Sequence, residues 1–332
     1  MWFVGEGSGW EAGTRPLDPT RRTGVGEVSA VAGVAGERFL FSMLGLVADT
    51  LLVYIAASLT RPIQPVLDTF SARTGIVVQR ESGASLEHVR KITELHRVPD
   101  LLLLADAEVF PQLLVPQYTT WYAEFARNRM VVAYTKRSKH ADEITRDNWT
   151  DVLARGDVEV GRTDPDLAPV GYRTLIMLKL AERFYRRPGL ANSLLAAASE
   201  RNIRPNAAEL AALLAAGELD YIYDYQSVAE SNGFSYIALP DEINLGDPRR
   251  AKEYATAGVM VRGSTRGSKT EFKGQPILYA LSEPLHAPHP TAASRFLAYL
   301  TSPDVVRRLR AAHVDMLDHP IVVGTGAPRE LR

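Results

Sequence analysis

The sequence contains no cysteine among its 332 residues. Disulfide bonds, thiolate metal sites, a cysteine nucleophile and a lipid-modified cysteine anchor are therefore excluded. The chain also carries little net charge, −1 at pH 7, so no overall field attracts nucleic acid or an anionic membrane. We therefore expect no nucleic-acid partner. A hydrophobic content of 46% and a charged content of 23% are typical of a globular protein, and the length suits one large domain or two of ordinary size.

Sequence motifs of common enzymes are also missing. There is no G-x-x-x-x-G-K-[ST] loop, no G-x-G-x-x-G after a strand and no G-x-S-x-G turn. The seven histidines include no i, i+4 pair, and we interpret them as surface or loop residues rather than as metal ligands. Ser85 and His88 could form a nucleophile and a base, but their spacing on one helix would turn His88 toward solvent. We therefore predict no catalytic residue, no metal site and no cofactor.

The first 48 residues differ from the rest of the chain. Residues 1–37 are rich in glycine and lack periodicity, which is typical of a disordered segment or of a wrongly assigned start. Arg38 is then followed by an apolar run over residues 39–48, in the outline of a secretory signal. We predict that the segment 1–48 is disordered or signal-like.

The folded part begins with a strand that leads into a helix. Residues 51–55 form an apolar run of strand length, residues 56–58 are small, and apolar residues recur at helical spacing from Ile63 to Phe70. Ser58 therefore lies where a buried strand meets a helix N-terminus, and such a place binds anions readily. The alternative is that Ser58 or Thr60 only caps its own helix.

The same pattern recurs twice in the next 50 residues. A second strand over residues 76–79 leads through small residues to a helix that begins near Ser85. A third strand, residues 101–104, consists of four leucines, and Ala105 and Asp106 are expected to begin the next helix. Parallel strands whose carboxyl ends meet at one edge form a crevice in which open α/β sheets bind ligands.

The second half of the chain continues as an α/β pattern. Strands are predicted over residues 130–134 and 276–281, and a strand that runs into a helix over residues 219–228. Helices are predicted over residues 172–185, 207–216, 291–300 and 304–313. We expect a turn-rich loop over residues 162–171.

Several segments in a fixed order carry a resemblance to a known family. They are residues 56–60 (AASLT), 83–85 (GAS), 99–106, 121–128, 169–174 (PVGYRT), 217–221 (GELDY) and 239–245 (LPDEINL). Together they resemble the molybdate/tungstate-binding proteins of ABC importers, and more specifically their tungstate-binding branch. The resemblance covers residues 51–320.

The resemblance implies a periplasmic-binding-protein type II fold, in which two α/β lobes close on a ligand cleft. Lobe 1 would comprise residues 49–126 and 285–325, and lobe 2 residues 127–284. The implied function is that of an extracytoplasmic receptor, a monomer without catalytic activity, that delivers molybdate or tungstate to an ABC permease in the membrane. Such a receptor is periplasmic or extracellular and can be membrane-associated. The alternatives are an intracellular sensor with the same fold and a degenerate receptor for another small anion.

The resemblance also implies the ligand-binding residues. Ser58 and Ser85 match hydroxyl donors of the family, and Ala105 matches a backbone N–H donor. The loop at Val170 and Gly171 matches a contact from the second lobe. Asp224 falls where the tungstate-binding branch has a carboxylate, usually glutamate, that approaches the metal.

The sequence departs from the family pattern at Ala168, where that branch has a second carboxylate. Asp164 or Asp166 could substitute for it. A lone Asp224 repels a dianion unless it binds the metal, is protonated or turns away, so the alternative is a surface or capping carboxylate. Tyr223 and Tyr225 alternate with Asp224 and are expected to pack in the core on the opposite side of the strand.

Overall fold

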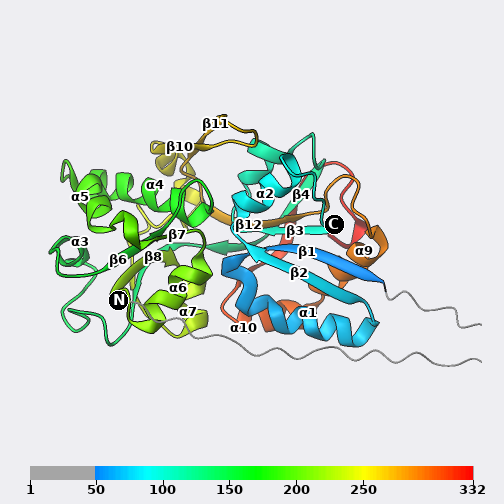
Figure 1. Cartoon of the computed structure of the whole chain (residues 1–332), viewed down its shortest axis with the longest axis horizontal. Helices are drawn as coiled ribbons and strands as arrows, with labels where there is room; N and C mark the ends of the chain where they lie inside the picture. The colour runs from blue at the N-terminus through cyan, green and yellow to red at the C-terminus, as the bar shows by residue number, and fades with distance from the viewer. Residues whose placement is uncertain (1–48, 332) are drawn as a thin grey trace, which may run out of the picture. The chain divides into compact units, whose positions relative to one another are not determined.

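The computed structural model describes residues 49–331, which belong to one compact unit. These residues are arranged around two main β-sheets, which define lobe 1 and lobe 2 (Figure 1). The segment 1–48, predicted to be disordered or signal-like, lies outside the described residues. From residue 49 to residue 331, every helix is too short or too polar to cross a lipid bilayer.

Lobe 1 is built on a six-stranded sheet with the order β13-β4-β12-β3-β1-β2. Strand β1 runs parallel to β2 and β3, whereas β12 and β13 run antiparallel to β4. The elements are β1 (Thr50–Ala56), α1 (Thr60–Thr74), β2 (Val77–Gly83), α2 (Ser85–Thr93), β3 (Leu101–Leu104), β4 (Trp121–Asn128), β12 (Ile277–Ser282), α9 (Pro290–Leu300), α10 (Pro303–Ala311) and β13 (Asp315–Gly324).

Lobe 2 is built on a five-stranded sheet with the order β7-β6-β8-β5-β9. Its elements are β5 (Met130–Tyr134), α3 (Trp149–Leu153), β6 (Val160–Thr163), α4 (Pro169–Phe184), α5 (Leu190–Ala197), β7 (Ile203–Arg204), α6 (Ala207–Ala216), β8 (Tyr221–Tyr225), α7 (Gln226–Asn232), β9 (Ser235–Ala238) and α8 (Ala251–Tyr254), together with the hairpin β10 (Gly258–Arg262) and β11 (Lys269–Lys273). In both sheets three parallel strands are followed by one antiparallel strand, so the two lobes share an arrangement.

The strands of all three predicted units of lobe 1 are present, and the first two lead into the predicted helices. Helix α1 buries Ile63 and Phe70 in the core, as its periodicity predicts, and Gly75 ends it with a left-handed φ of 73°. The four leucines of β3 are all buried, as expected for a central strand with both faces covered.

Two predicted helix boundaries are wrong. No α-helix begins at Ala105 and Asp106, where the chain turns instead, and the next helical segment is a short π-helical turn, Phe110–Leu114. Helix α4 begins at Pro169, three residues before the predicted start. Proline suits the first turn of a helix because its missing N–H would have no partner there. Val170 and Gly171 therefore lie in the first turn of α4 and not in a loop.

The predicted lobe boundaries stay a prediction, and the sheets lie close to them except at one strand. The chain passes from the first sheet to the second at Arg129, between β4 and β5, close to the predicted boundary. Strand β12 pairs with β3 and β4 in the sheet of lobe 1, although the boundary predicted at residue 284 assigns it to lobe 2. We therefore propose that the return crossing lies before Ile277.

A buried ion pair joins the two lobes. Asp106 follows β3 in lobe 1, and its Oδ2 lies 2.5 Å from Nη2 and 2.6 Å from Nε of Arg173 on α4. The hydroxyl of Tyr172 donates to the same oxygen at 2.7 Å, and Arg173 Nη1 donates to the backbone oxygen of Gln275 at 2.7 Å. Burial alone would lower the pKa of Arg173, but the Asp106 carboxylate raises it above its ordinary value, so the guanidinium stays charged.

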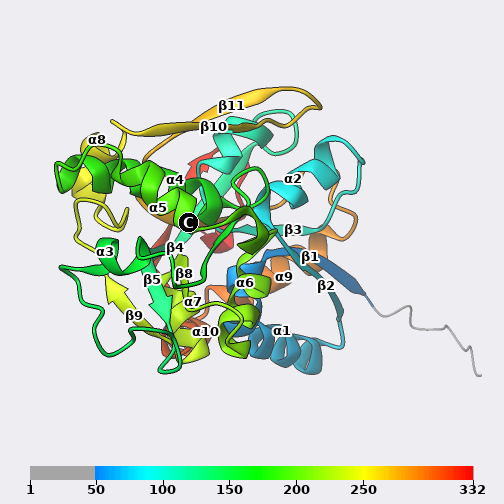
Figure 2. The same cartoon turned by 60° about the vertical axis from the view of Figure 1, so that its left-hand side comes forward.

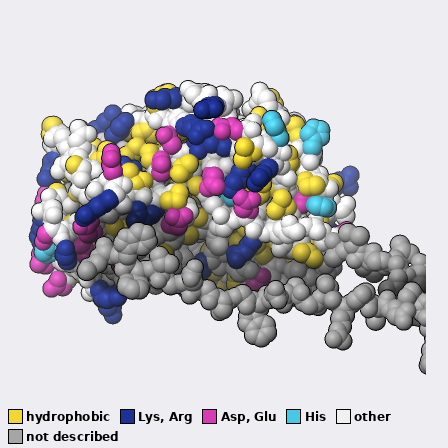
Figure 3. All heavy atoms as spheres, in the orientation of Figure 1, with side chains coloured by type: hydrophobic (Ala, Val, Ile, Leu, Met, Phe, Trp, Pro, Cys, Tyr) yellow, Lys and Arg dark blue, Asp and Glu magenta, His cyan; other side chains and the backbone are white. Residues whose placement is uncertain are grey.

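The β10–β11 hairpin forms a second connection between the lobes. It extends from lobe 2 over α2 of lobe 1, and Figures 1 and 2 both show this position. Arg262 at the end of β10 forms a salt bridge of 2.9 Å with Glu94, and the Thr93 hydroxyl donates to the backbone oxygen of Ser264 at 2.7 Å. On the face shown in Figure 3, basic and acidic side chains of the described residues are interspersed, in keeping with the small net charge.

Removal of one partner of the buried ion pair should destabilise the fold strongly. We expect Arg173→Met to lower the free energy of unfolding by about 3–5 kcal/mol, because it leaves the Asp106 carboxylate buried without its counter-charge. Urea unfolding of the full chain measures this loss. The matched control is Arg307→Met, which breaks an exposed ion pair with Asp304 and should have little effect. Equal effects of the two substitutions would contradict a structural role for the buried pair.

Candidate functional site

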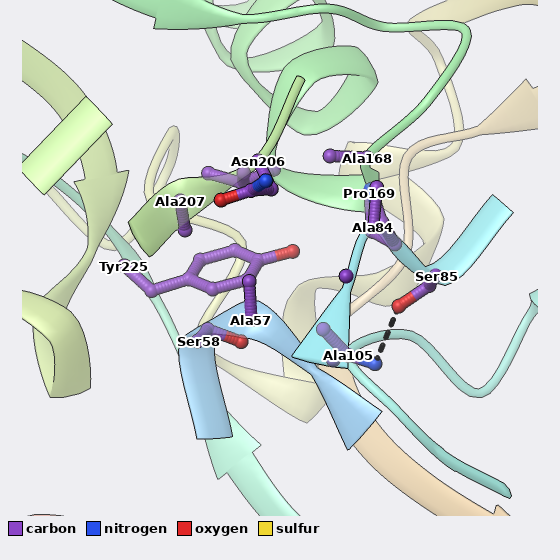
Figure 4. Close-up of a pocket in the computed structure, with 13 residues that line it drawn as sticks. Ala57, Ser58, Ala84, Ser85, Ala105, Ala168, Pro169, Asn206, Ala207 and Tyr225 are labelled. Atoms are coloured by element: carbon purple, nitrogen blue, oxygen red, sulfur yellow. Dashed lines mark hydrogen bonds between the residues drawn. The ribbon is translucent and has the colours of Figure 1, made fainter. Parts of the chain in front are cut away.

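A small cavity lies where segments of both lobes meet (Figure 4). Lobe 1 contributes residues 56–58, 83–85 and 105, which follow or end β1, β2 and β3. Lobe 2 contributes residues 168–170, 206, 207 and 225, which lie at the starts of α4 and α6 and at the end of β8. Four of the six predicted site residues, Ser58, Ser85, Ala105 and Val170, line this cavity.

Two serine hydroxyls of lobe 1 line the cavity, and each accepts a hydrogen bond from another group of lobe 1. Ser85 begins α2, and its Oγ accepts from the backbone N–H of Ala105 at 3.1 Å (Figure 4). Ser58 follows β1, and its Oγ accepts from the hydroxyl of Tyr279 at 2.9 Å. The Ala105 N–H, which was expected to face a ligand, is thus bonded to Ser85. Both serines keep their own protons to donate elsewhere.

Tyr225 is a site residue that the sequence interpretation missed. Its ring lines the cavity, and its buried hydroxyl has no hydrogen-bond partner among residues 49–331 (Figure 4). Burial raises the pKa of Tyr225, so this hydroxyl remains a donor. The prediction that Tyr225 packs away from the site is wrong, because the alternation along β8 turns Tyr225 and not Asp224 toward the cavity.

Asp224 does not line the cavity. Its side chain is fully buried, and its Oδ1 accepts from the backbone N–H of Tyr225 at 2.7 Å, while Oδ2 has no partner in the described part of the chain. Burial raises the pKa of this carboxyl to about 8, and the backbone hydrogen bond only partly opposes the shift. At neutral pH Asp224 is therefore mainly uncharged, and it is turned away from the position where it would repel an anion.

Gly171 also lies outside the cavity lining. A Cβ atom at this position would come within 2.6 Å of the backbone oxygen of Asp164, so the glycine is required for close packing of α4. Asp164 and Asp166 do not replace the missing carboxylate. Oδ1 of Asp166 accepts from the backbone N–H of Arg262 at 2.7 Å, and Oδ1 of Asp164 accepts from that of Asp166 at 2.8 Å.

Helix N-termini supply the electrostatics of the site. The first turns of α2, α4 and α6 reach the cavity, and each end carries a partial positive charge. Asn206 caps α6, accepting from the backbone N–H of Glu209 at 3.0 Å. No charged side chain is among the described residues that line the cavity. Asn206 was also missed, although it stands directly before a predicted helix, which is the pattern that identified Ser58 and Ser85.

His88 is buried and does not face solvent as its spacing suggested. Burial lowers the pKa of its imidazole to about 4, so the ring is neutral. Its Nε2 donates to the backbone oxygen of Ile55 at 3.1 Å, and the ring stacks on Tyr54. The side chain thus ties α2 to the end of β1 and does not line the cavity. Within residues 49–331, no group of three or more histidine, aspartate or glutamate side chains could hold a metal ion.

Comparisons with known proteins agree with this architecture. The family model for the bacterial extracellular solute-binding proteins matches residues 51–314. The chain belongs to this family. An uncharacterised solute-binding protein of Petrotoga mobilis is 41% identical over 269 residues, covering 80% of this chain and 84% of the relative. The molybdate/tungstate-binding protein WtpA of Thermococcus kodakarensis is 36% identical over 315 residues, covering 85% and 86%. The predicted resemblance to the molybdate/tungstate-binding proteins is thus confirmed.

Solved structures share the fold at low sequence identity. The periplasmic molybdate-binding protein of Azotobacter vinelandii has a TM-score of 0.55 and 17% identity, covering 80% of this chain and 98% of its own. The sulfate-binding protein SubI of Mycobacterium tuberculosis has a TM-score of 0.56 and 14% identity, covering 81% and 88%. The predicted α/β fold of the type II periplasmic binding proteins is therefore confirmed.

The raised pKa of Asp224 predicts a pH-dependent stability. In the unfolded chain an aspartate titrates near pH 4 (about 3.9), and in the folded protein at about 8. Between these values the folded state binds the extra proton, so stability falls as pH rises through this window. Asp224→Asn cannot ionise, and we expect its stability relative to the wild type to rise between pH 5 and pH 8, as measured by urea unfolding.

The control for this experiment is Asp318→Asn, at an exposed carboxylate. Its free energy of unfolding should change between pH 5 and pH 8 as that of the wild type does. If the free energy of unfolding of Asp224→Asn also changes as that of the wild type does, Asp224 ionises normally in the folded protein and the assigned environment is wrong.

Proposed function

We propose that this protein is the substrate-binding component of an ABC importer and that it binds a tetrahedral oxyanion, molybdate or tungstate, in the cavity between its lobes. It would act outside the cytoplasm as a monomer and deliver the anion to a membrane permease. The family match and the identity to WtpA support this role. We expect no catalytic activity, in keeping with a family that binds solutes.

The observation that carries the proposal is the convergence of neutral hydrogen-bond donors from both lobes. Ser58 and Ser85 offer hydroxyl protons from lobe 1, and the unpartnered Tyr225 hydroxyl faces them from lobe 2. Three helix N-termini add partial positive charge. Such a set stabilises an anion through oriented dipoles without a formal counter-charge.

The absence of a carboxylate from the cavity lining defines how the anion would be held. By the family resemblance, Ala168 stands where a carboxylate is expected, and the mainly uncharged Asp224 does not line the cavity. We therefore expect the ion to remain four-coordinate, with contacts to its oxygens and none to the metal. The cavity volume of about 10 Å³ holds about one water molecule, so the lobes must move apart for an oxyanion to enter.

Thermal unfolding of the full chain with molybdate, tungstate, sulfate or phosphate tests the proposal. A ligand present at 100 times its dissociation constant should stabilise the native state by about 2.7 kcal/mol. We expect molybdate and tungstate to raise the midpoint most. Ser58→Ala combined with Ser85→Ala should abolish the increase, because two donors to the anion are lost.

The matched control is Ser193→Ala, at an exposed position of α5 outside the cavity. It should leave the ligand-induced increase unchanged. Equal stabilisation by sulfate or phosphate would make the site a general oxyanion receptor, and stabilisation by none of the four anions would refute oxyanion binding.

A further inference from the structure

A chain of buried hydrogen bonds, which we call the crossing relay, lies behind Ser58. Its members are Ser227, Asn128, Tyr279 and Ser58, all of them buried. Asn128 Nδ2 donates to Ser227 Oγ at 2.7 Å and to the Tyr279 hydroxyl at 2.9 Å. The Tyr279 hydroxyl donates to Ser58 Oγ at 2.9 Å. Asn128 ends β4 and Tyr279 lies on β12, so both strands next to the lobe crossings contribute to the relay.

Backbone groups fix the orientation of the Asn128 amide in the relay. Asn128 Oδ1 accepts from the backbone N–H of Arg129 at 3.0 Å and from that of Ser227 at 3.4 Å. Because backbone N–H groups can only donate, the amide NH₂ of Asn128 must face the Tyr279 hydroxyl. Tyr279 therefore accepts from Asn128 and gives its single proton to Ser58. Burial raises the pKa of Tyr279, so the phenol keeps that proton.

Ser58 is consequently an acceptor on the relay side and a donor on the cavity side. Tyr279 occupies one acceptor position of Ser58 Oγ, and this hydroxyl has no other hydrogen-bond partner in the described part of the chain. Figure 4 shows the Ser58 oxygen at the edge of the cavity, below the ring of Tyr225. A hydroxyl proton with no internal acceptor is available to a bound anion.

We propose that Tyr279 and Asn128 are positioning residues: by filling one acceptor position of Ser58 Oγ, the Tyr279 hydroxyl keeps the Ser58 proton directed at the cavity, where it can bind an oxyanion. The proposal rests on the proposed oxyanion-binding function. Without the Tyr279 hydroxyl, the Ser58 hydroxyl gains a further orientation, and an anion would have to fix its direction on binding.

A double-mutant cycle tests whether Tyr279 acts through Ser58. Dissociation constants for molybdate are measured by calorimetry on the full-length wild type, Tyr279→Phe, Ser58→Ala and the double variant. We expect each single substitution to weaken binding about tenfold, the effect of one oriented hydrogen bond, and the double variant to be no weaker than Ser58→Ala. If the two effects multiply instead, Tyr279 acts independently of Ser58 and the proposal is wrong.

The matched control is Tyr254→Phe, which removes another buried hydroxyl that donates to Asp241 and accepts from Asp247, away from the cavity. It should leave the molybdate affinity unchanged. If Tyr279→Phe fails to fold, Asn128→Ala removes the donor that orients Tyr279 and should weaken molybdate binding in the same way. If the wild type binds no oxyanion, the proposed function itself is refuted. If the wild type binds molybdate but the effects of Tyr279→Phe and Ser58→Ala on the binding free energy add, only this inference is refuted.

Discussion

The buried ion pair between Asp106 and Arg173 sets how the two halves of the site meet. Asp106 directly follows Ala105, whose N–H holds Ser85, and Arg173 lies one turn into α4, whose start lines the cavity from lobe 2. Any change in the separation of the two charges would therefore also change the width of the cavity. Charges that lie this deep are costly to expose singly, so the ion pair favours the closed arrangement of the lobes over the open one that admits an anion. Arg173 also bonds to the backbone of Gln275, which lies beside the proposed return crossing, and this ties the ion pair to that segment.

A common principle governs the two serine donors of lobe 1. The N–H of Ala105 donates a hydrogen bond to Ser85 Oγ, and the hydroxyl of Tyr279 donates one to Ser58 Oγ. In each case a group that can only donate in that position fills one acceptor site of the serine oxygen and turns the serine proton outward. The dipoles are thus arranged before a ligand arrives, which lowers the entropic cost of binding. Tyr225 differs, since its hydroxyl has no internal partner to fix its direction.

The sequence predicted two of the three strand-to-helix junctions of lobe 1 correctly, because apolar runs, small residues and helical periodicity are local signals. They located Ser58 and Ser85, and the family resemblance added Ala105 and Val170, which also line the cavity. Strand β8 could not be interpreted in this way. All five of its residues, Tyr221–Tyr225, are buried, so no polar face marks which side meets the cleft. The role of Tyr279 depends on its hydrogen bond to Ser58, 221 positions away in the sequence, and local sequence patterns carry no information about such a contact.

A cavity without formal charge distinguishes anions of equal charge by their size. Sulfate and molybdate carry the same charge and no proton, so hydroxyl donors alone cannot separate them, and the cavity walls must discriminate between their sizes. Alanines supply much of these walls and leave the backbone close to the ligand. The serine protons can be donated to any tetrahedral dianion, so they determine how tightly an anion binds rather than which anion binds. Size selection therefore depends on how far the lobes close, whereas affinity depends on the hydrogen bonds that direct the protons of Ser58 and Ser85 at the cavity. Selectivity and affinity should therefore respond to different substitutions.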